Sequence, residues 1–191
     1  QKIHQELDTT TVYVTHDQEE AMTMSDRIIV LNNGEIQRIS SPEAAYNQPQ
    51  NRFVAEFIGS PSMNFIPCHM EGESLEAGPL RFSTPDSLTG KPAEVGIRPE
   101  DISLSADRTA DHPVGKVSVF EHIGAYNLVY IELSSIGEIV AQTPAGQYFE
   151  VGQSVSVSIK DNRIHLFDTD GKAIHNPPLP SESSRQPTPT N

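Results

Sequence analysis

The 191-residue sequence is poor in cysteine and in basic residues, and it has no tryptophan. Its one cysteine, Cys68, cannot form a disulfide within the chain, which favours a reducing compartment. It also lacks any apolar run of about 18 residues, so no membrane-spanning helix is predicted. Its 13 Lys and Arg are outnumbered by 26 Asp and Glu, giving a net charge of −13. This balance disfavours nucleic acids and anionic membrane surfaces as partners, because clustered Lys and Arg bind both.

Length and the opening residues bound the organisation of the chain. With 191 residues and a mass of 21.0 kDa, it can hold one or two domains with a buried core. The opening residues, QKIHQELD, lack the apolar segment of a secretory signal. They also lack an initiator Met and start within a polar helical pattern, so we expect the chain to be a piece of a longer protein.

The stretch 12–37 carries the most informative local pattern. The apolar run Val12–Val14 predicts a buried strand, and His16 follows where that strand ends. Asp17 is placed to cap a helix, and Glu20 three residues later completes a capping-box pattern. Ligands of open α/β sheets lie beyond the carboxyl ends of the strands. The pattern therefore predicts that His16 faces a ligand site.

Turn and cap signals divide the next part of the chain. Ile28–Leu31 predicts a second buried strand, and Asn33-Gly34 predicts a hairpin turn into a partner strand. Ser41 caps a short helix, Asn51 caps another, and Gly59 fits the end of the second. The apolar residues of that second helix recur at helical spacing, so we expect them to pack rather than to bind a ligand: Phe53, Val54, Phe57 and Ile58.

From Met63 onward, short β-prone runs alternate with turn residues. This texture predicts a small β-barrel or β-sandwich. The runs are 65–66, 80–82, 94–97, 117–120, 128–133, 139–140, 155–159 and 164–167. The segment 176–191 is rich in Pro, Ser and Thr and poor in apolar residues, so it predicts a disordered tail.

Two other groups of polar residues have a simpler interpretation. Cys68, His69 and Met70 are adjacent, and neighbours on a strand point to opposite faces, so we predict no metal site there. Glu19 and Glu20 fall in the first turn of the predicted helix, where carboxylates favour the helix dipole. We therefore expect these two to cap and solvate the helix rather than to catalyse.

Four segments occur in a fixed order: THDQEEAM from residue 15, SDRIIVLNNGEIQ from 25, YNQPQNRFVAEFIGSPSMNF from 46 and GIRPEDI from 96. Through this series, up to about residue 174, the chain resembles the ATP-binding subunits of ABC-type importers for sugars and glycerol 3-phosphate. The resemblance implies that residues 1–61 are the C-terminal part of an α/β nucleotide-binding domain. It implies that 62–175 form an all-β, OB-like regulatory domain of the kind also found in molybdate-binding modules.

The resemblance also implies roles for two residues of the first segment. In that family the histidine after the strand contacts the γ-phosphate of ATP, which implies this role for His16 and a supporting role for Asp17. The implied activity is ATP hydrolysis that drives solute import at the cytoplasmic face of the plasma membrane, with ATP and Mg²⁺ as cofactors of the intact parent. The implied partners are a second ATPase subunit, membrane-spanning permease subunits and a regulatory protein, with no nucleic acid.

The nucleotide-binding motifs of that family are missing from these 191 residues. There is no G-x-x-x-x-G-K-[ST] phosphate loop, whose backbone amides and lysine cradle ATP. There is also no LSGGQ-like signature and no apolar strand ending in Asp-Glu. We therefore expect these residues alone to be inactive as an ATPase and to bind no cofactor tightly.

The segment GIRPEDI is the sharpest motif of the second half. Arg98 precedes Pro99, which favours an extended residue and a fixed turn from which Glu100 and Asp101 project. On one interpretation the turn is a contact point within the dimer or with the nucleotide-binding domain, and Arg98 pairs a carboxylate through two hydrogen bonds. On the other, the turn simply joins two barrel segments.

Two other functions stay open. One is a stand-alone regulatory module that binds an oxyanion or a small solute without ATPase activity. The turn 124–127, Gly-Ala-Tyr-Asn, replaces small polar residues of the resembled family and weakens that case, and we expect His122 beside it to be structural. The other is an unrelated hydrolase that uses His16 with Asp17 or Glu20, but no nucleophile has a G-x-S-x-G context.

Overall fold

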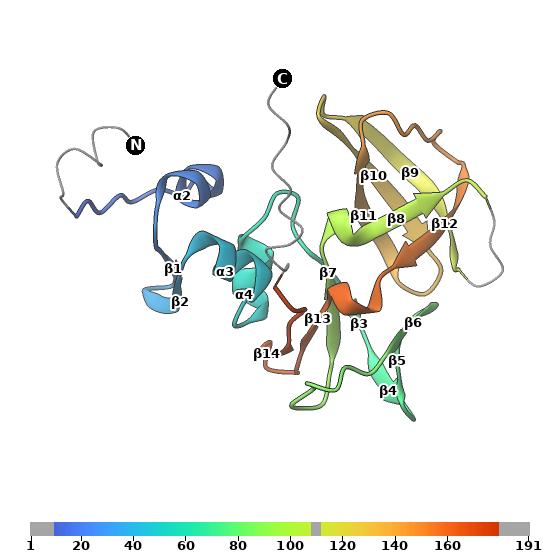
Figure 1. The fold of residues 1–191 in the computed structure, drawn as a ribbon. Coiled ribbons are helices and arrows are strands. Elements are labelled where there is room, and N and C mark those ends of the chain that lie inside the picture. The colour runs from blue at the N-terminus through green and yellow to red at the C-terminus, as the bar shows by residue number, and fades with distance from the viewer. Residues whose placement is uncertain (1–9, 108–111, 180–191) are drawn as a thin grey trace, which may run out of the picture.

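The computed structural model describes residues 10–107 and 112–179. Two parts that differ in secondary structure follow each other along the chain (Figure 1). The N-terminal part is helical with one hairpin, and the rest is built of short antiparallel strands. The N-terminal elements are α2 (Gln18–Met24), β1 (Ile28–Asn32), β2 (Glu35–Ser40), α3 (Pro42–Asn47) and α4 (Arg52–Phe57).

Each helix of this part begins at a residue that the sequence predicts as its N-cap. The side chain of Asp17 accepts from the backbone of α2, Ser41 from that of α3, and Asn51 from that of α4. These oxygens satisfy backbone N–H groups that have no partner inside the helix. The hairpin is also present, with Asn33 and Gly34 at positive φ of 51° and 82° in its turn.

The predicted buried strand at 12–14 is absent. Val12 and Val14 are 85% and 90% exposed, and among the described residues no strand pairs with this segment. An apolar run of this kind is buried only when neighbouring strands and helices cover it, and none of the described elements does so. The second predicted strand is buried on one face only, since Ile28 and Val30 are buried while the residues between and after them are exposed.

The β-rich part contains twelve strands and two short 3₁₀ helices among the described residues. Its strands are β3 (Asn64–Pro67), β4 (His69–Glu71), β5 (Ser74–Ala77), β6 (Leu80–Ser83), β7 (Glu94–Ile97), β8 (Ile102–Ser105), β9 (Val114–His122), β10 (Tyr126–Leu133), β11 (Gly137–Pro144), β12 (Ser154–Ile159), β13 (Ile164–Phe167) and β14 (Ala173–His175). The 3₁₀ helices are η1 (Pro99–Asp101) and η2 (Asp161–Arg163).

These strands form a five-stranded sheet (β11-β10-β9-β12-β8), a four-stranded sheet (β14-β13-β7-β3) and a three-stranded sheet (β4-β5-β6). All three sheets contribute to one apolar core, which contains Leu75 of β5, Val95 of β7, Val129 of β10 and Val157 of β12 at 0–1% exposure. The predicted β-rich domain of short strands is therefore confirmed. No helix of the described residues is long and apolar enough to cross a membrane.

A single side chain ties two of the sheets together. The amide of Asn64 on β3 donates to the carbonyl oxygens of Ile97 (3.1 Å) and Val140 (2.9 Å), and its oxygen accepts from Val140 N (2.8 Å). Asn64 thus bonds both backbone groups of one residue in β11, as a neighbouring strand would.

Helix α4 is shared by the cores of both parts of the chain. Val54 and Ile58 pack in a cluster with residues of β1 and α3, while Ala55 packs with Met63 and Phe167 of the β-rich part. The helix thus lies at the junction, just before the predicted change of domain between residues 61 and 62.

Ordered contacts extend beyond the start of the predicted tail. The side chain of Asn176 donates to the carbonyl oxygen of Pro49 (3.1 Å), and Pro177 is buried. The residues of the predicted tail from 180 on lie outside the described part of the chain.

Candidate functional site

His16 lies on an exposed loop immediately before α2. Within the described residues, no hydrogen bond or ion pair involves its ring. The loop therefore presents an imidazole whose two nitrogen atoms are available to a ligand. This is the position that the sequence predicts for it, although the strand before it is absent.

The residues around His16 fix its backbone through a closed set of hydrogen bonds. Asp17 Oδ1 accepts from the backbone N of Glu19 (2.8 Å) and Glu20 (3.1 Å). Asp17 N donates to Thr15 Oγ1 (2.9 Å), and Thr15 Oγ1 donates to Glu20 Oε2 (2.9 Å). Asp17 thus caps the helix as predicted, while Glu20 bonds the Thr15 hydroxyl instead of completing a capping box. The carboxylates of Asp17 and Glu20 are thus hydrogen-bonded within the loop and the start of α2, whereas the side chain of His16 is exposed to solvent.

Arg98 lies at the junction between the two parts of the chain and is only 1% exposed. Its Nη1 donates to the carbonyl oxygens of Ala55 (3.1 Å) and Ile58 (2.6 Å), and its Nη2 donates to that of Tyr46 (2.9 Å). The pairing with a carboxylate through two hydrogen bonds, which one of the two interpretations of this turn expects, is therefore wrong. The turn does contact the segment that resembles the nucleotide-binding domain, and its functional role stays a prediction.

The acceptors of Arg98 belong to the last turns of two helices. Tyr46 lies near the end of α3, while Ala55 and Ile58 lie at the end of α4. Carbonyl oxygens there have no intrahelical donor, and they carry the negative end of the helix dipole. The guanidinium, 4.0 Å from the centroid of the Tyr46 ring, therefore caps both helices at once. Burial lowers the pKa of Arg98, and its Nε has no hydrogen-bond partner within the described residues.

The two predicted carboxylates of this turn have other partners. Glu100 accepts a hydrogen bond from the hydroxyl of Tyr46, and burial together with this bond raises the pKa of Tyr46. Asp101 accepts from Arg163 Nε (2.8 Å), and burial raises the pKa of Asp101 while Arg163 opposes that rise. Tyr46 and Arg163 lie 54 and 62 residues away from their partners along the chain, so no local pattern identifies them.

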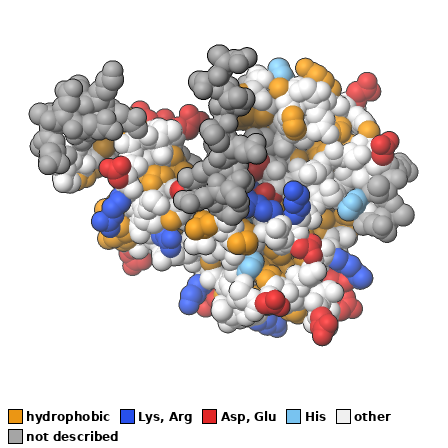
Figure 2. Space-filling view, viewed as in Figure 1, with side chains coloured by type: hydrophobic (Ala, Val, Ile, Leu, Met, Phe, Trp, Pro, Cys, Tyr) orange, Lys and Arg blue, Asp and Glu red, His pale blue; other side chains and the backbone are white. Residues whose placement is uncertain are grey.

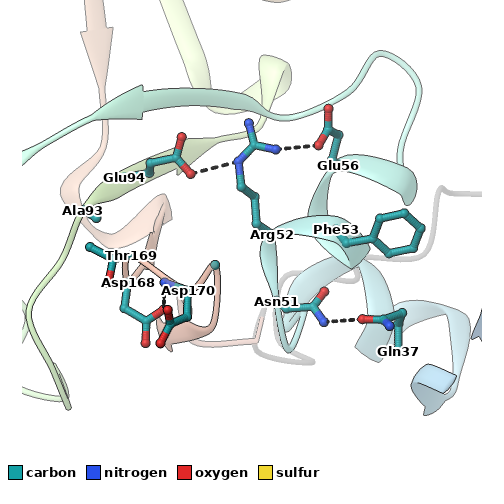
Figure 3. A pocket seen from close by; sticks show the side chains of 11 residues that line it. Gln37, Asn51, Arg52, Phe53, Glu56, Ala93, Glu94, Asp168, Thr169 and Asp170 are labelled. Atoms are coloured by element: carbon teal, nitrogen blue, oxygen red, sulfur yellow. Dashed lines mark hydrogen bonds and ion pairs between the residues drawn. The ribbon is translucent and has the colours of Figure 1, made fainter. Parts of the chain in front are cut away.

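A hollow of about 640 Å³ opens beside α4, and no residue of the His16 loop lines it (Figure 3). Across it, Arg52 donates from Nε to Glu94 (2.8 Å) and from Nη1 to Glu56 (2.7 Å). Asn51 donates to Gln37 Oε1 (2.9 Å) on another side of the hollow. These polar groups therefore pair with each other, and the sequence singles out none of them as a ligand.

A group of side chains with metal-ligating atoms lies on one face of the β4–β5 hairpin. Atoms of His69, Glu71 and Glu76 lie within 4.8 Å of one another. The sequence places His69 beside Cys68 and predicts no site; the register instead brings it opposite Glu76. Glu76 Oε1 already pairs with Arg81 Nη2 at 2.5 Å, so a guanidinium supplies the positive charge here.

The turn after β9 offers little to an oxyanion. Asn127 is fully buried, and its Nδ2 donates to the carbonyl oxygens of Pro144 (3.0 Å) and Gln147 (2.7 Å). Its Oδ1 accepts from His122 Nδ1 (2.7 Å). Both side chains thus have structural partners, as the sequence predicts for His122.

On the face shown in Figure 2, Lys and Arg side chains are scattered among Asp and Glu and gather into no basic patch over the described residues. The surface thus follows the acidic composition of the chain.

The three antiparallel sheets and their shared apolar core define a β domain of short strands. Residues 59–102 match the MalK OB fold domain, and residues 95–167 match the TOBE domain. The predicted OB-like class is thus confirmed.

Curated relatives extend the match to the N-terminal part. The chain is 40% identical over 191 residues to the xylose/arabinose import ATP-binding protein XacK of Haloferax volcanii (95% of this chain, 50% of the relative). It is 40% identical over 183 residues to the maltose/maltodextrin import ATP-binding protein MalK of Photobacterium profundum (90% and 49%). It is 37% identical over 178 residues to the sn-glycerol-3-phosphate import ATP-binding protein UgpC of Rhizobium meliloti (91% and 49%).

The homologues of this chain are therefore ATP-binding proteins of ABC importers for sugars and glycerol 3-phosphate, and the resemblance predicted from the sequence is confirmed. The chain spans about half the length of the curated relatives that it matches.

Proposed function

We propose that the chain is the C-terminal portion of the ATP-hydrolysing subunit of an ABC importer for sugars or related solutes. In this proposal His16 contacts the γ-phosphate of ATP. The observation that carries it is the His16 loop, in which an exposed ring without partners among the described residues stands on a backbone fixed by its neighbours. The import ATP-binding proteins among the relatives support it.

The loop performs this role by positioning rather than by covalent chemistry. A nitrogen of His16 donates a proton in a hydrogen bond to a phosphoryl oxygen and helps to hold the attacking water. Asp17 keeps the first turn of α2 capped, so the direction of His16 does not have to be set when the nucleotide binds. When bound, ATP supplies the phosphoryl group and Mg²⁺ neutralises charge on its oxygens.

The chain itself has limited means to bind nucleotide. Asp17 and Glu20 are bonded within the loop, and the 191 residues carry no phosphate loop. We therefore expect these residues alone to hydrolyse no ATP and to hold neither ATP nor Mg²⁺ tightly. The same proposal assigns 62–175 to a regulatory and dimer-stabilising domain. It adds a second ATPase subunit, permease subunits and a regulatory protein as partners, at the cytoplasmic face of the membrane.

The test uses a longer protein that contains this chain together with a phosphate loop. His16→Ala should lower kcat for ATP hydrolysis by about 100-fold or more, as loss of one transition-state contact does, with a smaller change in KM. His69→Ala, at an exposed histidine of the β-rich part, is the matched control and should leave kcat unchanged. Equal activity of the two variants would overturn the assignment of His16.

The stand-alone binding module makes a different prediction for the 191-residue chain. Calorimetric titration with molybdate, sulfate and phosphate should show binding if the β-rich part is an oxyanion receptor. We expect no heat of binding, because the polar atoms of Asn127 are already bonded within the protein. Stoichiometric binding would favour the receptor.

A further inference from the structure

One peptide group lies between the His16 loop and the β-rich part. It is the peptide that joins Ile58 to Gly59, directly after α4. Its C=O accepts from Arg98 Nη1 at 2.6 Å, and its N–H donates to Gln18 Oε1 at 3.0 Å. Arg98 and Gln18 are thus hydrogen-bonded to opposite sides of one planar peptide group.

The Gln18 end of this peptide leads directly to His16. Gln18 is the first residue of α2 and lies two positions after His16. Asp17 between them bonds the first turn of the same helix. The Gln18 side chain therefore joins the start of α2, next to the His16 loop, to the N–H of Gly59.

The Arg98 end leads into the β-rich part. Arg98 joins β7 to η1. Its guanidinium is held in place by hydrogen bonds to three carbonyl oxygens and by contact with the Tyr46 ring. A hydrogen bond from a cation is about twice as strong as a neutral one, and it polarises the peptide that accepts it. The Gly59 N–H, on the same peptide, is thereby a stronger donor to Gln18.

The space around this peptide admits no intervening side chain. Gly59 has a φ of +125°, and a Cβ there would lie 2.7 Å from Arg98 Nη1 and 3.2 Å from Tyr46 Cε2. The backbone therefore approaches the guanidinium as closely as only glycine permits. Arg98 and Gln18 are thus connected through this one peptide group, and the close packing around Gly59 leaves it little room to move.

We propose that Gln18 and Arg98 are positioning residues for His16, and that the Ile58–Gly59 peptide transmits a displacement of the β-rich part to the His16 loop. This proposal rests on the proposed function of His16. It assigns the regulatory domain a physical route to ATP hydrolysis. When Arg98 is drawn away, the peptide loses its strongest donor, Gln18 is released, and the loop no longer holds the ring in place.

The coupling is measured first on the 191-residue chain by NMR, without nucleotide. The variants are Gln18→Ala and Arg98→Lys, with Arg163→Lys as the control because it alters the neighbouring turn but not this peptide. Each test variant should raise the hydrogen-exchange rate of the Gly59 amide by about tenfold. In the double variant this rate should be close to that of the faster single variant. Arg98→Lys should also shift the ring resonances of His16, while Arg163→Lys should leave them in place.

Two results would overturn the coupling. One is a folded Arg98→Lys variant whose Gly59 and His16 signals match those of the unmodified chain. The other is a double variant whose effects on Gly59 exchange multiply as independent changes do.

A kinetic experiment then separates this proposal from the proposed function. In the longer ATP-hydrolysing protein, Gln18→Ala and Arg98→Lys should each lower kcat by about three- to tenfold with KM for ATP unchanged, and the double variant by no more than the larger single change. If His16→Ala abolishes hydrolysis while these two act independently or not at all, only the coupling fails. If His16→Ala has no effect on kcat, the function of His16 fails, whatever the NMR coupling shows.

Discussion

Acidification from pH 7 to pH 5 should destabilise the protein through His165, a buried residue of β13. Its side chain is 2% exposed, and its Nδ1 donates to Asn176 Oδ1 at 2.7 Å. Burial lowers the pKa of His165 to about 3, the bond to Asn176 opposes the shift, and the nearby cations Arg98 and Arg163 add to it, as does His175. The folded protein therefore holds this ring neutral.

The size of the effect follows from the two pKa values. In the unfolded chain a histidine titrates near about 6.5, so between that pH and about 3 the unfolded state binds a proton that the folded state does not. Stability is therefore complete above the unfolded pKa and is lost as the pH falls below it. Between pH 7 and pH 5 the loss from His165 alone is about 2 kcal/mol.

The assay is urea unfolding at both pH values for the protein and for His165→Gln, which keeps a donor but does not titrate. The carboxylates contribute equally in both proteins, so the difference between the two pH dependences isolates His165. His69→Gln, at an exposed ring, should retain the full pH dependence. If the protein and His165→Gln lose the same stability between pH 7 and pH 5, the ring is not held neutral by burial and the reasoning fails.

Three further expectations concern other buried groups. Burial raises the pKa of the Cys68 thiol to about 11, so its alkylation by iodoacetamide at pH 8 should be about 100-fold slower than that of free cysteine and should recover in urea. Gly96→Ala places a Cβ 2.4 Å from Met63 Sδ and should cost about 1–3 kcal/mol in chemical denaturation, whereas Gly146→Ala, with nothing within 4 Å, should cost almost nothing. Asn127→Ala replaces a fully buried side chain that donates to the carbonyl oxygens of Pro144 and Gln147, and it should cost about 1–3 kcal/mol by the same measurement. An unchanged midpoint for either destabilising variant would contradict its stated contacts.

The parts of the fold that were predictable are those set by neighbours in the sequence. Asp17, Ser41 and Asn51 cap their helices because a cap involves residues within one turn. The Asn33-Gly34 turn likewise needs only its own two residues to reach positive φ. For the same reason the sequence correctly places His16 directly before Asp17, the N-cap of α2.

The parts that failed depend on distant partners. The run Val12–Val14 has the composition of a buried strand, but burial is a property of the elements that cover it. The carboxylate partner expected for Arg98 fails for a similar reason, since the nearest carboxylates in sequence bond Tyr46 and Arg163 instead. Helix ends brought in from some 40–50 residues away supply its acceptors.

The amide of Asn64 has a consequence for self-association as well as for folding. β11 is one of the two edge strands of its sheet, and an edge strand offers unpaired backbone groups to other chains. Asn64 occupies the N–H and C=O of Val140 with the hydrogen bonds that an added strand would make there. A variant without this amide would therefore leave the N–H and C=O of Val140 without partners halfway along β11, and its self-association would increase with protein concentration even where the monomer remains folded.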